Sequence, residues 1–354
     1  MPAAALDKIL IIRFSSLGDI LLASPLVRLL RRAYPHAQID FLLKSKFADL
    51  MRYNPDLSSL IELSTSDGKE LNELRRRIQT VRYDAIFDLH NSLRSRYVRT
   101  FAGAKHVRVV DKKLFPRFML LNLKKNFYGK NVPGVAQRYI ETAHSFGIED
   151  DQEGLNIVVP RDIASETSVL LSKYHLDRHE HVIGIVAGAR HFTKRWPQER
   201  FVALGCMMAK EYKAKLLLFG GKEEEEYCGD IAQMINASCG ASAAENLAGS
   251  LSLLENAAAF DACNLVVTND TGLMHVAAAR KRKIVAIFGS TVREFGFFPS
   301  YTENIVVERN GLDCRPCTHI GLAKCPEGHF RCMKEIDGHD VARVVRQLMN
   351  IPVH

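Results

Sequence analysis

Three short polar segments carry the side chains in this sequence that could do chemistry. Asp19 directly follows Gly18 and is a candidate general base, because a carboxylate at such a turn can accept a proton from a bound hydroxyl. Lys194 lies in a polar loop, where its ammonium could meet phosphate oxygens. The third segment, residues 269–275, begins with Asn-Asp-Thr-Gly and leads into an Ala-rich helix, as phosphate sites at helix N-termini do. Together the three segments predict a ligand that carries phosphate groups.

Each segment also has a purely structural interpretation. An Asp such as Asp19 near the start of a helix is favoured by the helix dipole alone. Lys194, with Arg190 and Arg195 nearby, could belong to a solvated surface loop. The third segment could be an ordinary capped helix with a packed His. Residue types alone leave both interpretations open for all three segments.

The segments each follow an apolar run of the kind that forms a buried parallel strand. Such runs occur at 8–13, 38–43, 60–63, 84–88, 106–110, 181–187, 215–219, 264–268, 283–288 and 304–308. Expected helices lie between or after them, at 20–32, 69–81, 137–146, 165–174, 198–208, 251–263, 273–279 and 340–349. This alternation predicts an α/β fold built on doubly wound parallel sheets.

A second domain of the same class is expected in the second half of the chain. A polar stretch near 160–178 interrupts the pattern, which restarts at His181. A chain of 354 residues is long for a single core, so two domains are the natural expectation. In the second domain, a Gly-Gly turn opens a helix whose first turn contains Glu223 and Glu224. Acidic residues there stabilise the helix, and they could also bind ribose hydroxyls.

The composition is that of a globular protein with an anionic partner. Apolar residues make up 47% of the chain and charged residues 25%. The formal net charge of +8 favours a nucleotide, a nucleic acid or an acidic membrane surface. Aromatic and basic residues do not form a recognisable nucleic-acid module, so we expect no nucleic-acid partner. No signal-peptide pattern opens the chain and no apolar run reaches about 18 residues, so we expect a cytoplasmic location.

The stretch 111–130 has a composition of its own. It contains six basic residues and one acidic residue, interleaved with Phe, Leu and Met. This pattern is typical of a basic amphipathic segment that lies on a membrane surface. It is equally typical of a helix that packs its apolar face on the domain and leaves its charges in water. The sequence does not decide between the two.

Four segments together resemble the bacterial glycosyltransferase family 9, the ADP-heptose:lipopolysaccharide heptosyltransferases. Residues 11–19 resemble the family's N-terminal loop, whose Asp is the proposed catalytic base, and residues 88–95 resemble a segment of its N-terminal domain. Residues 194–197, Lys-Arg-Trp-Pro, resemble the Lys-x-Trp-Pro segment whose Lys contacts the donor. Residues 269–275 resemble its Asp-Ser/Thr-Gly-x-x-His nucleotide-sugar motif. The first and last motifs together make the resemblance specific, and it spans about residues 8–340.

The resemblance implies the GT-B glycosyltransferase fold, in which two Rossmann-like doubly wound domains face a cleft. An acceptor-binding domain is then expected over residues 1–165. A donor-binding domain is expected over residues 166–335. The C-terminal helix, within residues 336–354, is expected to pack back on the N-terminal domain.

The resemblance also implies an activity and roles for particular residues. The reaction is an inverting, metal-independent transfer of heptose from ADP-L-glycero-D-manno-heptose to the lipopolysaccharide inner core, on Kdo-lipid A or a heptosyl acceptor. Its implied catalytic residues are Asp19 and Lys194. Its implied donor-binding residues are Arg195, Glu223, Glu224, Asp270, Thr271, Gly272 and His275, and its implied acceptor-binding residues are Ser15, Ser16, Gly18 and Arg94. Such an enzyme would be cytoplasmic, with peripheral contact to the inner membrane as a further possibility.

Two other functions remain open at this level. One is a GT-B transferase that uses another nucleotide sugar in cell-surface glycan synthesis, since the segment 288–299 suggests a subgroup with a different sugar. The other is a nucleotide-binding protein without enzymatic activity. A dehydrogenase is disfavoured, because no turn between strand and helix carries a clean G-x-G-x-x-G.

Four of the eight Cys residues lie within 19 positions near the C-terminus: Cys314, Cys317, Cys325 and Cys332. Their C-x2-C-x7-C-x6-C spacing suits a structural zinc site. A reducing cytosol would disfavour disulfides. The cluster also resembles a Cys-rich tail found in a subset of the family. Structural zinc, free thiols and disulfides are three open interpretations, and none assigns the cluster a part in catalysis.

Overall fold

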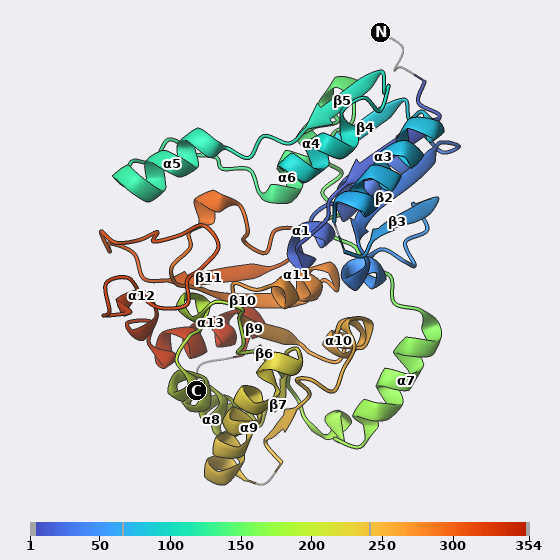
Figure 1. The fold of residues 1–354 in the computed structure, drawn as a ribbon. Helices are drawn as coiled ribbons and strands as arrows, with labels where there is room; N and C mark the ends of the chain where they lie inside the picture. Colours follow the sequence, from blue (N-terminus) through green and yellow to red (C-terminus); the bar gives the residue numbers. More distant parts are fainter. Residues whose placement is uncertain (1–4, 66, 241, 352–354) are drawn as a thin grey trace. The chain divides into compact units, whose positions relative to one another are not determined.

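The computed structural model describes residues 5–65, 67–240 and 242–351 of the chain (Figure 1). It divides into two compact units, the first made of Met1–Leu114 and Pro133–Val158, the second of Phe115–Val132 and Val159–His354. The main boundary therefore falls at 158/159, where we placed it at 165/166. The second unit also takes in residues 115–132, which the sequence analysis assigned to the first domain.

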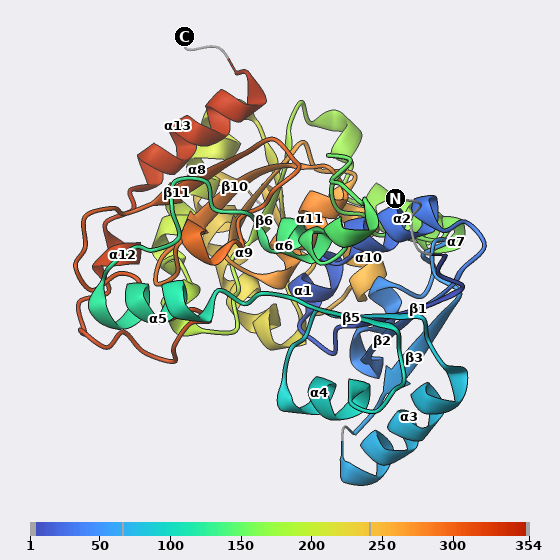
Figure 2. The ribbon, with the colours of Figure 1, turned by 90° about the horizontal axis from the view of Figure 1, so that it is seen from above.

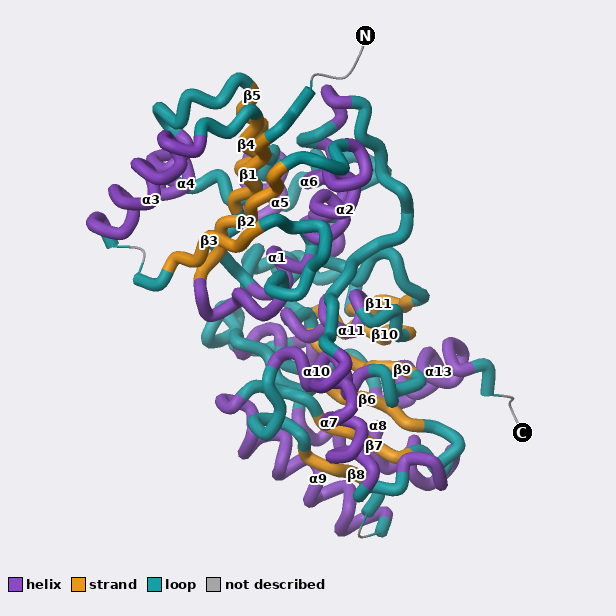
Figure 3. The backbone as a smooth tube through the Cα atoms, turned by 90° about the vertical axis from the view of Figure 1, so that its right-hand side faces the viewer, coloured by secondary structure: helices purple, strands orange, loops and turns teal. Residues whose placement is uncertain are grey.

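The first unit contains a five-stranded sheet in the order β3-β2-β1-β4-β5, and every pairing in it is parallel. The strands are β1 (Lys8–Ile12), β2 (Gln38–Lys44), β3 (Ser59–Leu63), β4 (Ala85–Asp88) and β5 (His106–Val109). Central strands β1 and β4 are buried along most of their length, because helices cover both faces of the sheet. In Figure 3, α3 (Gly68–Val81) and α4 (Leu93–Arg99) lie on one face of this sheet, and α2 (Ser24–Ala33) and α6 (Val135–Glu141) lie on the other.

The helices of the first unit are α1 (Leu17–Leu21), α2 (Ser24–Ala33), α3 (Gly68–Val81), α4 (Leu93–Arg99) and α6 (Val135–Glu141). They follow the expected alternation, except that no helix was expected at α4 and that α1 and α2 replace a single expected helix. The single helix expected over 20–32 is wrong, because the chain breaks between α1 and α2. Pro25 lies in the first turn of α2, where its missing N–H costs nothing, whereas inside a continuous helix it would remove a hydrogen bond. The break leaves α1 as a short helix directly after the β1 loop.

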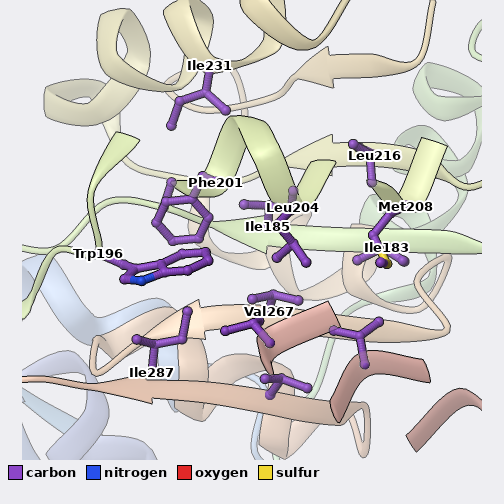
Figure 4. Close-up of a cluster of buried hydrophobic side chains, with 14 of the residues drawn as sticks. Ile183, Ile185, Trp196, Phe201, Leu204, Met208, Leu216, Ile231, Val267 and Ile287 are labelled. Carbon is purple, nitrogen blue, oxygen red and sulfur yellow. The ribbon is translucent and has the colours of Figure 1, made fainter. Parts of the chain in front are cut away.

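The second unit contains a six-stranded parallel sheet in the order β11-β10-β9-β6-β7-β8. Its strands are β6 (Val182–Val186), β7 (Lys215–Leu218), β8 (Ala244–Asn246), β9 (Leu265–Asn269), β10 (Lys283–Phe288) and β11 (Asn304–Glu308). Strand β8 was not expected, because its three residues include only one apolar side chain. Figure 4 shows the core on one face of this sheet, where Trp196, Phe201 and Leu204 pack over Ile185 and Val267.

The helices of the second unit are α5 (Leu114–Leu123), α7 (Arg161–Ser172), α8 (Gln198–Tyr212), α9 (Glu225–Cys239), α10 (Leu253–Phe260), α11 (Gly272–Ala279), α12 (Arg331–Lys334) and α13 (Gly338–Met349). Only the first residue of α5 belongs to the first unit. Among the described residues, no helix is long and apolar enough to cross a membrane.

The C-terminal helix α13 packs within the second unit, and the expectation that it also returns to the N-terminal domain stays a prediction. It contacts α8, β9, β10 and β11 and lies beside α8 in Figure 2. The reason is an apolar stripe at helical spacing: Val341, Val345 and Leu348 are buried in the same core as Trp196. The Lys283 ammonium also donates to the Leu348 carbonyl, which satisfies one acceptor at the helix end.

Candidate functional site

The strand order of each sheet marks one place where a ligand crevice can form. In the first unit, β1 lies between β2 and β4; in the second, β6 lies between β7 and β9. In the first sheet the chain runs from β1 to β2 in one direction and from β4 to β5 in the other, and in the second sheet β6 and β9 diverge in the same way. The loops at the carboxyl ends of these neighbouring strands therefore separate. Asp19 follows β1, Lys194 follows β6 and Asp270 follows β9. Each of the three polar segments singled out in the sequence therefore lies at the topological switch point of its own unit.

Asp19 is buried in the first turn of α1 and is held from two sides. Its Oδ2 accepts hydrogen bonds from the Ser16 backbone N–H at 3.0 Å and the Ser16 hydroxyl at 2.6 Å. Its Oδ1 lies 2.5 Å from the guanidinium of Arg13. Burial by itself raises the pKa of Asp19, but Arg13 and the Ser16 hydrogen bonds outweigh it and hold the pKa below its ordinary value. The carboxylate is therefore ionised and fixed in orientation.

Arg13 is the partner of Asp19 that the sequence analysis did not single out. It is the last residue of the apolar run that contains β1, and its guanidinium also donates to the Leu89 carbonyl at 2.5 Å. The guanidinium lies 5.7 Å from the ring centroid of Tyr139. The sequence signal was present, since an Arg inside an apolar strand run needs a buried acceptor. Arg13 thus links the β1 loop to the loop after β4.

The loop after β4 adds a neutral imidazole to this region. The His90 ring lies 4.8 Å from the ring of Phe14, centroid to centroid. Burial, followed by the positive charge of Arg13, lowers the pKa of His90 to about 3. His90 is therefore neutral at physiological pH and adds no positive charge beside Asp19.

The other sequence-predicted acceptor residues are placed unequally. Ser16 is the N-cap of α1 and bonds Asp19, so it orients the candidate base. Gly18 is buried inside α1, whereas Ser15 is half-buried in the loop before it. Arg94 is exposed on α4. The structure therefore joins Ser16 directly to Asp19, and the acceptor role of Arg94 stays a prediction.

Lys194 and Asp270 meet at the switch point of the second unit. The Lys194 ammonium lies 2.7 Å from Asp270 Oδ2, and the Thr291 hydroxyl donates to the same oxygen at 2.7 Å. Thr291 follows β10, so three loops converge on one carboxylate. Because Asp270 is negative and buried, it suits a role in holding Lys194 and Thr291 better than direct contact with a phosphate.

The strand ends beneath this cluster are tied together by Asn269. Its side-chain amide donates to the Ala187 carbonyl at 2.7 Å, and its side-chain oxygen accepts from the Trp196 backbone N–H at 3.1 Å. Trp196 is fully buried, and its indole N–H donates to the Ile336 carbonyl at 3.1 Å. Trp196 is therefore a packing anchor that fixes the loop carrying Lys194.

The segment after β9 forms a helix N-terminus, as expected. Thr271 is the N-cap of α11, and its hydroxyl accepts from the Leu273 backbone N–H at 3.3 Å. Gly272 is the first helical residue, and His275 lies one turn inside, buried. The first-turn N–H groups and the helix dipole together offer a site for an anion next to Lys194.

Arg195 differs from Lys194 in where its charge goes. Its Nε donates to the Ala189 carbonyl at 2.6 Å, and the guanidinium lies 5.9 Å from the ring centroid of Tyr227. The guanidinium is thus turned back onto the loop after β6 and the helix α9. Arg195 thus stiffens the loop that carries Lys194, and its predicted contact with the donor stays a prediction.

The structure separates the two candidate ribose ligands. Glu224 packs against Gly188 so closely that any side chain at position 188 would collide with it. Glu224 Oε2 also accepts from the Gly221 backbone N–H at 2.8 Å. Glu223 is exposed. Glu224 therefore lies where the loops after β6 and β7 meet, at the edge that also carries Lys194.

The four-Cys segment supports the loop after β10. Arg315, inside the Cys-x-x-Cys, donates to the carbonyls of Gly289 at 2.7 Å and Thr291 at 2.9 Å. All eight Cys are free thiols, so the structure contradicts the disulfide interpretation. Burial, reinforced by neighbouring thiols, raises the pKa of Cys317 to about 11. Within the described part of the chain, no three His, Cys, Asp or Glu side chains are arranged to hold a metal, and the zinc interpretation stays a prediction.

Solved structures with the same architecture identify the class of protein. The E. coli ADP-heptose lipopolysaccharide heptosyltransferase II matches with a TM-score of 0.71 and 26% identity, over 97% of this chain and 98% of that one. A glycosyl transferase family 9 structure from Veillonella parvula matches with a TM-score of 0.79 and 24% identity, over 99% and 100%. Two doubly wound units with sites at their switch points thus define a glycosyltransferase of the GT-B fold, which confirms the expected fold class.

Sequence comparison then gives the family. A model described as glycosyltransferase family 9 (heptosyltransferase) matches residues 71–326. The lipopolysaccharide heptosyltransferase 2 of E. coli K12 is 31% identical over 297 residues, which cover 81% of this chain and 84% of that protein. This chain belongs to glycosyltransferase family 9, and the resemblance inferred from its four motifs is confirmed.

Proposed function

We propose that this protein transfers heptose from ADP-L-glycero-D-manno-heptose to the lipopolysaccharide inner core. The observation that carries the proposal is the convergence of Lys194 and the N-terminus of α11 at one switch point, in a chain related to heptosyltransferases. A related solved structure is described as an ADP-heptose lipopolysaccharide heptosyltransferase II. Relatives named heptosyltransferase 2 reach 31% identity, whereas a relative named heptosyltransferase 1 reaches 24%. We therefore favour a heptosyl acceptor over Kdo-lipid A.

In the proposed reaction, Asp19 takes the proton of the acceptor hydroxyl. That oxygen attacks the anomeric carbon of heptose from the face opposite the leaving diphosphate, so the configuration inverts. The new C–O bond forms as the bond to the phosphate oxygen breaks, and ADP leaves with the bonding electron pair. The ion pair with Arg13 keeps Asp19 ionised, although the same lowered pKa makes it a weaker base.

Charge on the departing ADP is stabilised from the second unit. The Lys194 ammonium and the first-turn N–H groups of α11 supply positive potential at the leaving phosphate. Asp270 and Thr291 hold that ammonium, so it needs little rearrangement when charge develops. These groups could carry the role that a divalent cation has in other transferases, which supports the proposal of a metal-independent reaction.

The direct test is product analysis. Purified protein is incubated with ADP-heptose and a lipopolysaccharide core that ends in a single heptose, and the products are weighed by mass spectrometry. A gain of one heptose and release of ADP supports the proposal. Transfer from another nucleotide sugar in a parallel panel would reassign the donor. Nucleotide binding without transfer from any donor would favour the non-enzymatic alternative.

Arg13 gives a prediction about pH. In Arg13→Gln the buried Asp19 loses its cation, so its pKa rises and the carboxylate protonates at a higher pH. Because the ionised form is the base, the acid limb of kcat/KM should move to higher pH, and activity should fall more steeply at pH 5 than at pH 8. The pH profile of kcat/KM measures the shift, with Arg13→Lys as the charge-retaining control. An equal loss at every pH would leave Arg13 with a structural role alone.

Glu224 gives a prediction about donor affinity. If its carboxylate binds the ribose hydroxyls, Glu224→Gln should raise the KM for ADP-heptose about tenfold and leave kcat nearly unchanged, because a charged hydrogen bond is lost equally in ground and transition states. Glu223→Gln is the matched control, one residue away and exposed. A larger effect at Glu223 would transfer the ribose contact to that residue.

A further inference from the structure

The segment 111–130 is the feature that the catalytic proposal leaves unexplained. We define its apolar surface by five residues of α5 and the loop after it: Leu114, Phe115, Phe118, Leu123 and Phe127. Their exposures are 57%, 64%, 59%, 54% and 52%. Within α5, whose residues are all described, Leu120 alone is buried. The interpretation that this helix packs its apolar face on the domain is therefore wrong.

The segment is held in place by polar contacts with other parts of the second unit, to which residues 115–132 also belong. The Lys124 ammonium donates to the carbonyls of Pro316 at 2.7 Å and Cys314 at 3.3 Å. The Asn126 amide donates to Glu294 Oε1 at 3.0 Å. These anchors fix the end of α5 and the loop that follows it without covering the Phe rings. The five apolar side chains are thus exposed on an element that is held in a fixed position, so their exposure does not come from a loose segment.

The apolar surface has an internal order of its own. The rings of Phe115 and Phe127 meet edge to face at 5.7 Å, so the loop after α5 folds back against the start of the helix. Five large apolar side chains within 14 positions form a concentration, whereas soluble proteins expose such residues singly. Such a concentration marks an interaction surface.

The charges beside this surface indicate what it contacts. Lys125 and Lys130 are exposed and Arg117 is half-buried, all within or just after α5. No acidic residue occurs between positions 112 and 130. Lys124 is occupied by backbone carbonyls, so it holds the segment in place and is not counted among the surface cations.

We propose that α5 and the loop after it dock on an anionic lipid surface, with the Phe rings in the headgroup–acyl boundary and the Lys side chains on lipid phosphates. Amphipathic helices that lie on membranes bury Phe and Leu side chains at that boundary, and a cation near an anionic leaflet gains electrostatic energy. A protein groove would call for anchors at regular helical spacing, whereas Phe127 comes from the loop. The inference deepens the proposed function by placing its enzyme at the membrane that carries the acceptor, but its test needs neither donor nor acceptor.

The test is flotation of the full chain with vesicles of phosphatidylcholine, with and without phosphatidylglycerol. The protein should float with the anionic vesicles, and higher salt should release it in part. Phe115→Ser with Phe118→Ser should lower the partition coefficient at least tenfold, because two large apolar side chains no longer enter the boundary. Lys125→Gln with Lys130→Gln should lower it about fivefold for each charge removed, on anionic vesicles alone.

Matched variants separate these effects from general surface changes. Val169→Ser removes an apolar side chain that is 74% exposed on α7, and Lys69→Gln with Lys173→Gln removes two exposed charges elsewhere. Both controls should float like the unchanged protein, and thermal melting should show that all variants fold. Absence of flotation on every vesicle overturns the proposal, as does equal loss in the controls. Failure of the heptose-transfer assay alone would leave the lipid result standing, since the two measurements are independent.

Discussion

Replacing Asp19 with Asn is expected to lower kcat/KM for heptose transfer about a thousandfold, within the range that a general base contributes. The amide keeps the size of the carboxylate and can still accept from Ser16, but it cannot take the proton of the acceptor hydroxyl. Asp19 lies in the first unit, whereas the proposed ADP site lies in the second. The affinity for ADP should therefore stay within about twofold of that of the unchanged protein. Steady-state kinetics and calorimetric titration with ADP measure the two quantities.

The control for this substitution is Asp49→Asn. Asp49 lies on the surface of the same unit and pairs with Arg52 at 3.1 Å. The Asp49→Asn substitution therefore removes a carboxylate without changing the β1 loop. It should leave transfer nearly unchanged. If Asp19→Asn keeps more than a tenth of the activity, the base is another group. If it melts at a much lower temperature and loses ADP binding as well, the carboxylate serves the fold.

Replacing Lys194 with Ala is expected to lower kcat about a hundredfold or more, since it removes a fixed cation from the leaving phosphate. The KM for ADP-heptose should rise as well, because the diphosphate of the bound donor loses the same charge. Asp270 would then be left buried without its ammonium partner at 2.7 Å, and its repulsion of the phosphates would add to the loss. Initial rates over a range of donor concentration separate the two effects.

Two further variants make the Lys194 result interpretable. Lys194→Arg retains the charge, and it should recover part of kcat even though the planar guanidinium fits the Asp270 contact differently. Lys210→Ala removes an exposed charge from α8 in the same unit and should change neither constant. Unchanged donor kinetics in Lys194→Ala would remove this residue from the site. A lowered melting temperature with normal kinetics would make the pair with Asp270 structural.

The strands could be predicted from the sequence because each is a run of buried apolar residues in a parallel sheet. The run 283–288 coincides with β10, and the run 8–13 extends one residue beyond β1. Strand β8 escaped prediction because Ala244–Asn246 lacks such a run and is a strand through its pairing with β7. The break between α1 and α2 could have been predicted from Pro25, which disfavours a continuous helix. It was missed because the apolar residues on both sides of Pro25 follow one helical pattern.

Helix placement was less predictable than helix existence. The stripe of Val341, Val345 and Leu348 predicts that α13 buries one face, but it does not say against which domain. Likewise, the basic and apolar pattern of α5 fits both a packed helix and an exposed one. The answer came from contacts distant in sequence, such as Lys124 with Pro316, which no local pattern contains.

The sequence by itself determined the family and the α/β class, and it named the residues proposed for each site. It did so because those features depend on local strings: an apolar run, a Gly turn, and an Asp, Lys or Asn-Asp-Thr-Gly after it. The tertiary structure alone decided which partners these residues have. Arg13 holds Asp19, Asp270 holds Lys194, and Glu224 packs against Gly188 whereas Glu223 is exposed. The physical reason is that charge and hydrogen bonding act over a few ångströms in space, across loops that parallel strands bring to one edge of a sheet.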